Sequence, residues 1–331
     1  MSAKYSRIIS TGSALPAARI TNEDLARRLA ADGIETSDEW IRTRTGIEAR
    51  RFVNGTTETT TTLAAAAAQK ALEGGSVDPK TIDLIIVATT TPDQVFPSTA
   101  AAVQRLIGAA GCAAFDVQAV CAGFIYALNA ADAMLRAGPY QRALVIGAET
   151  MSRVIDMKDR ATCVLFGDGA GAVVLEASAK PGILAARMYA DGSYDENVLG
   201  LTARIDHGEL CGRPYINMDG RQVFKLAVDG LTSSAQEVAV LAGVDPQDVD
   251  VYIPHQANLR IMTMVAKKLG IPDERMIKTV SEQGNTSAAS VPLALDEAVR
   301  SGKISDGSLV LLQAVGAGMA WGSAIVRWRS E

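Results

Sequence analysis

The sequence is poor in the residues that build disulfide frameworks and metal sites. It has four cysteines and two histidines in 331 residues. Four cysteines without a CxxC pair are too few for a disulfide scaffold and do not match a structural zinc site. Two distant histidines without a carboxylate cluster give no set of metal ligands. We therefore expect reduced thiols and no metal.

An excess of basic charge and an N-terminal apolar segment are also lacking. Thirty-two Lys and Arg against 37 Asp and Glu give a net charge of −5. Such a protein is a poor candidate for nucleic-acid binding, which depends on a basic surface. The opening residues, MSAKYSRIISTG, contain no apolar core of signal-peptide length. We expect a cytoplasmic protein that does not bind nucleic acid.

One stretch has the length of a membrane span. Residues 307–326 carry no charge. However, Gln313, Gly316, Gly318 and Gly322 interrupt its apolar runs. The pattern predicts two buried strands joined by a glycine turn rather than a membrane helix.

Short apolar strands alternate with longer Ala- and Leu-rich helical runs, which is typical of an α/β protein. The strands are apolar on both faces, so we expect helices on both sides of each sheet. The predicted strands are 84–88, 143–147, 251–253 and 309–312.

An internal repeat divides the chain. VDPKTIDLII begins at residue 77 and VDPQDVDVYI at residue 244, an offset of 167 with five of ten positions identical. Two more pairs follow in the same order: AMLRAG with EAVRSG, and GAVVL with GSAIV. The order of the three pairs indicates a duplication, with packed halves and helices between the sheets.

Cys121 is the candidate nucleophile among the cysteines. A strand ends near Val117, and a helical pattern runs from about Cys121. Unpaired N–H groups and the dipole at a helix start favour a thiolate, so we expect a lowered thiol pKa. A small buried core residue is the alternative. Cys112 and Cys163, the latter in a strand-like run, are expected in the core, and Cys211 in a loop.

His255 and Asn285 also follow predicted strands. His255 comes after strand 251–253, at the strand end where α/β proteins usually bind ligands. By the repeat, the Asn285 segment takes the place that the Cys121 segment has in the first half, although Asn is also a common turn residue. The three side chains are expected in one pocket. His207, in a polar loop, is expected at the surface.

The glycine cluster FGDGAGAVVLE, residues 166–176, is not a dinucleotide loop. A dinucleotide fingerprint opens a helix after a strand. Apolar strand-like residues precede and follow this cluster. The pattern predicts a glycine-rich hairpin.

Three segments carry a family resemblance. DVQAVCAGFIYAL around Cys121, PHQANLRI around His255 and GNTSAASVP around Asn285 resemble β-ketoacyl-[acyl carrier protein] synthase III, the condensing enzyme that starts fatty-acid chains. The resemblance covers nearly the whole chain, from Thr11 to the segment at Trp321. It implies a thiolase-like fold of five αβαβα layers in two duplicated halves, residues 1–175 and 176–331.

The resemblance also implies a mechanism. Cys121 would take the acyl group of an acyl-CoA primer, acetyl-CoA by default, and the backbone N–H groups of Cys121 and Ala317 would stabilise the oxyanion. His255 and Asn285 would donate to the thioester oxygen of malonyl-[acyl carrier protein]. The products would be a 3-oxoacyl-carrier protein, CoA and carbon dioxide. Acyl-CoA is a substrate, and no cofactor is implied.

Further residues carry over as binding groups. Trp40 and Arg44 in SDEWIRTRTG, with Arg160 in KDRAT, would hold the nucleotide of CoA. Phe224 would line the pantetheine tunnel. Phe96 would close the acyl pocket of the partner subunit in a homodimer.

Residues 259–269 form a predicted helix with a basic face. Arg260, Met264 and Lys267 lie at i, i+4 and i+7, with Lys268 beside them. Carrier proteins are acidic, so this face is a docking candidate. An ordinary solvated face is the alternative.

Two related enzyme classes fit the sequence less well, and one alternative function remains. A degradative thiolase needs a second cysteine where QAVGAG, residues 313–318, has none. Elongating condensing enzymes use a second histidine where Asn285 stands. Residues 200–213 depart from the family pattern near the expected entrance. A secondary-metabolite condensing enzyme or acyltransferase with another primer therefore stays open. A non-catalytic acyl-carrier or CoA-binding module is conceivable, but the intact triad argues against it.

Overall fold

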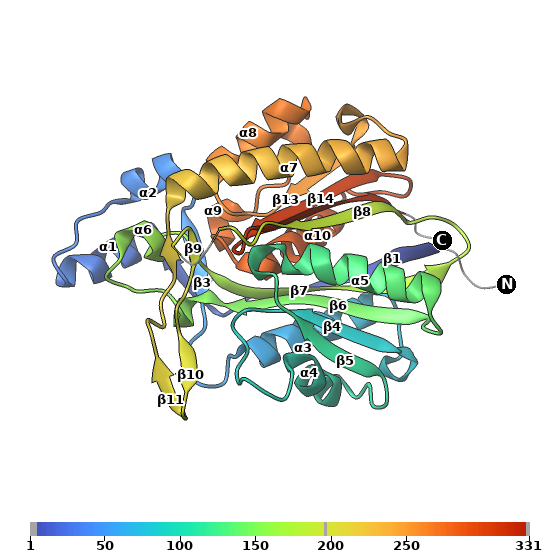
Figure 1. Ribbon diagram of the computed structural model, residues 1–331, viewed down its shortest axis with the longest axis horizontal. Coiled ribbons are helices and arrows are strands. Elements are labelled where there is room, and N and C mark those ends of the chain that lie inside the picture. The colour runs from blue at the N-terminus through green and yellow to red at the C-terminus, as the bar shows by residue number, and fades with distance from the viewer. Residues whose placement is uncertain (1–4, 195–196, 329–331) are drawn as a thin grey trace.

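The helices and strands stack in five layers (Figure 1). The computed structural model describes residues 5–194 and 197–328, so the outer limits of the predicted halves, residues 1 and 331, lie outside the described residues. From one side to the other the layers are helices, a five-stranded sheet, helices, a four-stranded sheet and helices. This confirms the predicted αβαβα architecture.

The first sheet has the strand order β1-β7-β6-β4-β5. Strands β6, β4 and β5 are parallel, whereas β7 runs antiparallel to β6 and β1 antiparallel to β7. The second sheet has the order β13-β14-β15-β8, with β13 and β14 parallel. The bounds are β1 Tyr5–Ala14, β4 Leu84–Ala88, β5 Ala113–Val117, β6 Arg142–Thr150, β7 Asp168–Ser178, β8 Ile183–Ala190, β13 Val251–Pro254, β14 Leu309–Gly316 and β15 Ala320–Arg327.

Helices α5 (Gly123–Ala137) and α10 (Ser290–Arg300) form the middle layer. Both are buried over most of their circumference, as expected for helices enclosed by two sheets. Helices α3 (Thr60–Gly74) and α4 (Thr99–Ile107) cover the first sheet, and α7 (Gly220–Ala242) and α8 (Leu259–Leu269) cover the second. The apolar faces of these layers form the core.

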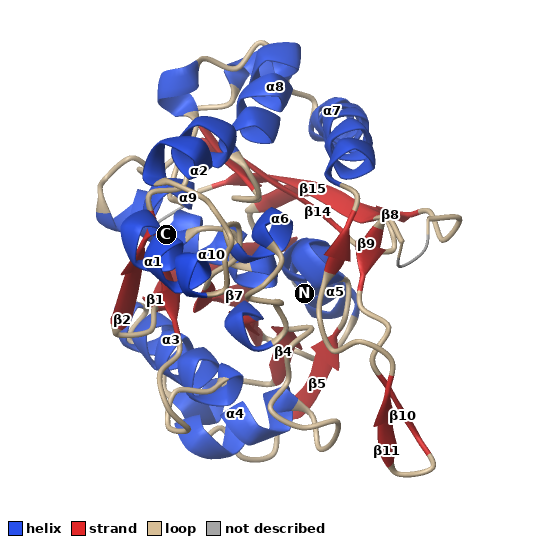
Figure 2. Cartoon of the chain, turned by 90° about the vertical axis from the view of Figure 1, so that its left-hand side faces the viewer, coloured by secondary structure: helices blue, strands red, loops and turns tan. Residues whose placement is uncertain are grey.

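Smaller elements lie at one end of the layers (Figure 1). They are β2 Ala18–Thr21, α1 Asn22–Ala31, α2 Asp38–Thr45, β3 Ala49–Phe52, α6 Arg160–Cys163, β9 Leu199–Gly200, β12 Asn217–Met218 and α9 Val280–Gln283. Strands β10 (Arg204–Asp206) and β11 (Glu209–Cys211) form a hairpin that stands out from the body (Figure 2).

The repeat has the same local structure in both halves. Asp78 and Asp245 each accept a backbone N–H two residues ahead, and each opens a 3-10 turn, Pro79–Thr81 or Pro246–Asp248. Strands β4 and β13 then begin. The division expected between residues 175 and 176 falls inside β7, and the chain passes to the second sheet at residues 179–182.

The uncharged segment 307–326 forms antiparallel strands β14 and β15, as predicted. Within the described ranges, no helix combines the length and the hydropathy that a bilayer crossing requires.

Three local predictions were wrong. Residues 166–176 form no hairpin, because residues 168–176 all belong to the single strand β7. Its glycines serve packing instead: a Cβ on Gly171 would lie 2.6 Å from the backbone nitrogen of Leu293 in α10. Cys163 is buried but ends the short helix α6, and Cys211 ends strand β11.

Candidate active site

Cys121, His255 and Asn285 line one cavity of about 450 Å³. The volume falls within the range of small-molecule sites. All three side chains are at most 7% exposed. Cys121 lies in the 3-10 turn Val120–Ala122 before α5, His255 directly follows β13, and Asn285 lies between α9 and the 3-10 turn Ser287–Ala289 that precedes α10. The topology therefore brings together residues that are up to 164 positions apart (121 to 285).

Cys121 sits in a tight backbone turn at the start of α5. The preceding Val120 has φ +47°, in the left-handed region that costs a β-branched residue strain. Gly316 of β14 packs on this turn: a Cβ there would lie 2.6 Å from the Cys121 backbone nitrogen. The glycine is thus required for the approach of β14 to the nucleophile.

The predicted lowering of the Cys121 pKa was wrong. Burial raises the pKa of this thiol to about 12, hydrogen bonding with Ser287 works against the rise, and the nearby Glu149 charge adds to it. Desolvation of a thiolate outweighs the helix-start effect because the sulfur has almost no contact with water. The Cys121 side chain is therefore a neutral thiol near pH 7.

The His255 ring is hydrogen-bonded through Nδ1. Ser290 Oγ lies 2.6 Å from His255 Nδ1 and also accepts the Gln256 N–H at 3.4 Å. When the serine hydroxyl donates to Nδ1, the ring proton lies on Nε2, which is then a donor. Burial lowers the pKa of His255 to about 3, so the ring is neutral near pH 7.

Asn285 is fixed through its backbone and its side-chain oxygen. Its N–H donates to Leu165 O at 2.8 Å, and its carbonyl accepts the Gly167 N–H at 2.9 Å. Its Oδ1 accepts the Ser287 N–H at 2.9 Å. Because the oxygen is occupied, the amide NH₂ is the group left to donate to a molecule in the cavity.

Ala317 lines the cavity in the turn between β14 and β15, beside the start of α5. The positions of Ala317 and Cys121 agree with a pair of backbone donors at one oxyanion. Their role stays a prediction.

The three residues expected at the CoA nucleotide are together. The Arg44 and Arg160 guanidinium carbons lie 4.5 Å and 4.4 Å from the Trp40 ring centroid. Asn258, which lines the cavity, donates its side-chain N–H to Arg44 O at 3.2 Å, so this group adjoins the cavity mouth. Phe224 lines the cavity itself.

The residues expected to meet other proteins are exposed. On α8, Arg260, Lys267 and Lys268 face outward, while Ile261, Val265 and Leu269 are buried. Arg260 also lines the cavity, and Lys268 pairs with Asp229 at 3.3 Å. Phe96 is 82% exposed and does not line the cavity of its own chain.

Segment 200–213, which departs from the family pattern, borders the cavity. Gly200, Leu201 and Ala203 are among the lining residues, whereas the β10–β11 hairpin, which stands out from the body (Figure 2), contributes none. His207, at the hairpin tip, has a 98% exposed side chain, as predicted for a surface residue. Cys112 is half-buried, and its thiol is not part of a disulfide.

Sequence reasoning missed the residues that support the site. They are Thr90, Thr91, Glu149, Ser287 and Ser290. The repeat held one signal that could have pointed to Ser287, because the offset of 167 pairs it with Val120, the neighbour of Cys121. In the structure both residues have a left-handed backbone, with φ +47° for Val120 and +50° for Ser287. Ordinary Ser, Thr and Glu residues carry no further pattern.

Comparison with known proteins bears on the chemistry. The model of 3-oxoacyl-[acyl-carrier-protein (ACP)] synthase III matches residues 115–192, and that of its C-terminal part matches residues 240–328. The crystal structure of 3-oxoacyl-[acyl-carrier-protein] synthase III from Aquifex aeolicus VF5 is 48% identical, with a TM-score of 0.90, over 98% of this chain and all of that one.

Two further structures are similar over nearly the whole chain. The enzyme of the same name from Thermus thermophilus is 40% identical, with a TM-score of 0.91, over 98% of this chain and 100% of that one. The priming β-ketosynthase of the R1128 polyketide biosynthetic pathway is 36% identical, with a TM-score of 0.93, over 99% of this chain and 97% of that one.

Proposed function

The chain belongs to the 3-oxoacyl-[acyl-carrier-protein] synthase III family of condensing acyltransferases, and on that premise we propose the reaction it catalyses. The reaction is a decarboxylating condensation of an acyl-CoA primer, by default acetyl-CoA, with malonyl-[acyl carrier protein]. It yields a 3-oxoacyl-carrier protein, CoA and carbon dioxide, starts fatty-acid chains in the cytoplasm, and needs no cofactor. One observation carries the proposal: a thiol and two neutral N–H donors share a single buried cavity.

In the first half-reaction the Cys121 sulfur attacks the acyl thioester carbon. The bond from that carbon to the CoA sulfur breaks, and the thiol proton ends on CoA. Negative charge develops on the acyl oxygen, where the N–H groups of Cys121 and Ala317 stabilise it. Burial makes the free thiolate costly, so ionisation accompanies attack instead of preceding it.

In the second half-reaction the bond to the malonyl carboxylate breaks, and its electron pair forms an enolate. The charge lies on the thioester oxygen, between His255 Nε2–H and the Asn285 amide. Carbon dioxide leaves, the enolate carbon attacks the acyl carbon, the bond from that carbon to the Cys121 sulfur breaks, and the released thiolate takes up one proton. Donors that act on developing charge lower the barrier selectively.

A secondary-metabolite condensation is the second candidate. The R1128 priming ketosynthase is 36% identical over nearly the whole chain, with a TM-score of 0.93, so the same fold serves a polyketide pathway. The two functions differ in the primer. Segment 200–213, which departs from the family pattern, borders the cavity.

The test is intact-protein mass after incubation with a panel of acyl-CoAs from acetyl to long-chain. The expected result is one acyl group per chain from a short primer, and none on Cys121→Ala. Selective uptake of a longer or branched primer would favour the secondary-metabolite function. Absence of covalent uptake from every primer would overturn both and leave a binding module.

The proposal includes a homodimer. Val95 and Phe96, in the loop between β4 and α4, are 74% and 82% exposed, which is unfavourable for two large apolar side chains. A partner copy that receives Phe96 in its acyl pocket would bury it, and twofold pairing is the usual arrangement. A monomeric mass in solution at micromolar concentration together with full activity would contradict this.

A further inference from the structure

Glu149 is a carboxylate with no solvent exposure, near the end of β6 and close to the nucleophile. In the part of the chain that the structure describes, its hydrogen-bond partners come from two segments, residues 89–91 and Ser287. All of them are donors. The two half-reactions described above assign Glu149 no role.

Residues 89–91 donate to both oxygens of the Glu149 carboxylate. Thr90 donates its hydroxyl at 2.9 Å and its N–H at 3.1 Å, and Thr91 donates its hydroxyl at 2.5 Å and its N–H at 3.1 Å. Thr90 and Thr91 also line the cavity. These residues begin the loop that carries Phe96.

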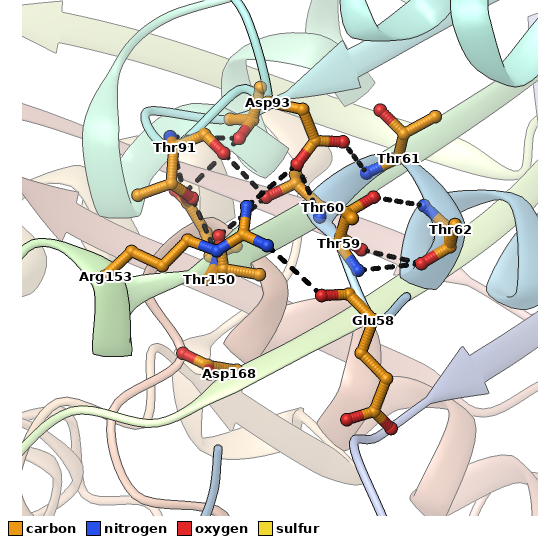
Figure 3. A network of polar contacts seen from close by, with 12 residues as sticks. Glu58, Thr59, Thr60, Thr61, Thr62, Thr91, Asp93, Thr150, Arg153 and Asp168 are labelled. Atoms are coloured by element: carbon orange, nitrogen blue, oxygen red, sulfur yellow. Dashed lines mark hydrogen bonds and ion pairs between the residues drawn. The ribbon is translucent and has the colours of Figure 1, made fainter. Parts of the chain in front are cut away.

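That segment is itself anchored, as Figure 3 shows. Thr60 donates its hydroxyl to Thr91 O at 2.6 Å, and the Thr150 N–H donates to Thr91 Oγ1 at 2.8 Å. Further out, Asp93 accepts from Arg153 at 3.0 Å and from the Thr60 N–H at 3.1 Å. Residues 89–91 are therefore held in place, and they fix the position of the Glu149 carboxylate.

Ser287 is the hydrogen-bond partner of Glu149 from the second segment. Its hydroxyl donates to Glu149 Oε1 at 3.0 Å, and its N–H donates to Asn285 Oδ1 at 2.9 Å. Ser287 has φ +50°, a backbone conformation that a serine keeps only where its surroundings hold it. The hydrogen bond to Glu149 is a direct restraint on that conformation.

We propose that Glu149 is a positioning residue for the condensation step, because it holds Ser287 so that the Ser287 N–H keeps the Asn285 amide aimed into the cavity. The inference rests on the proposed function. Glu149 acts through Ser287 and Asn285 and has no contact with the reacting atoms. Its loss should therefore affect the step that uses the Asn285 donor more than the step that uses the backbone donors.

The first experiment is Glu149→Gln. The amide keeps the shape but places an NH₂ among donors, so at least one hydrogen bond is lost. Carbon dioxide release from malonyl-carrier protein should fall roughly 10- to 100-fold in kcat, the effect of a misplaced reacting group. Acylation of Cys121 by acyl-CoA, measured by mass in a single turnover, should not fall, because the Glu149 charge raises the pKa of the thiol and its removal acts in the opposite direction.

A double-variant test separates positioning from general weakening of the fold. In an Asn285→Ala background, Glu149→Gln should cause no further loss of carbon dioxide release, because the group it positions is gone. Asp132→Asn is the matched control, a buried carboxylate in α5 that accepts from Ser6 at 2.7 Å. It should leave the ratio of the two half-reactions unchanged.

Ser287→Ala tests the same link if Glu149→Gln does not fold. It removes the hydroxyl and keeps the N–H, and it should show the same selective loss. Slowing of acylation alone would mean that the hydroxyl serves the Cys121 thiol, and would overturn the inference. A full loss from Glu149→Gln in the Asn285→Ala background would do the same.

The inference and the proposed function fail in different ways. If the wild-type protein neither takes up acyl mass nor releases carbon dioxide, the proposed function is wrong and the inference falls with it. If the wild type does both and Glu149→Gln and Ser287→Ala match it in both steps, only the role of Glu149 is wrong.

Discussion

Ser290 Oγ lies 2.6 Å from Nδ1 of His255, so the serine hydroxyl is the hydrogen-bond partner of that ring nitrogen. When the serine donates to Nδ1, the ring proton lies on Nε2. Nε2 then holds the hydrogen that the decarboxylation step needs. A serine in the first turn of α10 thus sets the chemistry of a histidine 35 residues away.

Ser290→Ala should therefore slow decarboxylation and spare acylation. Without its partner, the ring is free to adopt the tautomer that turns a lone pair toward the thioester oxygen. We expect a loss of roughly 10-fold or more in carbon dioxide release, the lower end of what an outer hydrogen-bond partner contributes. Ser301→Ala, at the other end of α10, is the control. Equal activity of Ser290→Ala and wild type would remove the serine from the mechanism.

The pH dependence of alkylation reports the state of Cys121. Because burial raises the pKa of this thiol to about 12, only a small thiolate fraction exists at neutral pH. The rate of iodoacetamide labelling at Cys121, followed by peptide mass, should rise about tenfold per pH unit from pH 7 to 9.5. A plateau below pH 8 would mean that the helix start outweighs burial.

A decrease in pH should destabilise the fold through His255. Above about pH 6.5 the histidine is neutral in both states, but below it the unfolded chain takes up a proton and the folded chain, with a pKa of about 3, does not. The unfolding free energy should thus fall as pH decreases from about 6.5 toward about 3. The His255 contribution lost by pH 5 is about 2 kcal/mol.

Denaturant titrations at pH 7.5 and 5.0 measure this effect. Wild type should lose about 2 kcal/mol more between them than His255→Gln. His207→Gln, which changes an exposed side chain at the hairpin tip, is the control and should behave as wild type does. Equal losses for wild type and His255→Gln would refute the assignment.

Gly316→Ala should impair both half-reactions. The added methyl group would meet the Cys121 backbone nitrogen at 2.6 Å and Ala119 O at 3.0 Å, so the nucleophile turn or β14 must shift. A misplacement of this size typically costs on the order of 100-fold in rate. Gly192→Ala, where a Cβ meets nothing within 4 Å, is the control. Normal acylation by Gly316→Ala would show that the turn tolerates movement.

Lys267→Glu should weaken binding of the carrier protein alone. The side chain is exposed on α8 and, unlike Arg260, does not line the cavity. KM for malonyl-carrier protein should rise, most at low salt, while acylation by acyl-CoA stays unchanged. Lys180→Glu, in the turn between β7 and β8, makes the same charge change elsewhere. A similar rise in KM for Lys180→Glu would mean that net charge, rather than docking on α8, is responsible.

Local sequence signals were sufficient for most of the fold. The buried strands around Ile85 and Leu311 appear as apolar runs, and the turns before β4 and β13 as two VDP segments, because these elements depend on neighbours in sequence. The offset of 167 also predicted two related halves. The hairpin predicted for residues 166–176 was wrong because a glycine such as Gly171 is needed for the close packing of α10, which lies more than 100 residues further on.

The candidate site divides in the same way. The residue types of Cys121, His255 and Asn285, with their segments, could be recognised along the chain, since nucleophiles and donors are rare and their surroundings distinctive. The ionisation of Cys121 could not, because desolvation depends on every element packed around the sulfur. Nor could the roles of Glu149 and Ser290, whose hydrogen bonds cross from one half to the other or from one helix start to another. Sequence determined which groups are present, and only packing in three dimensions decided their protonation, their tautomer and the direction in which they donate.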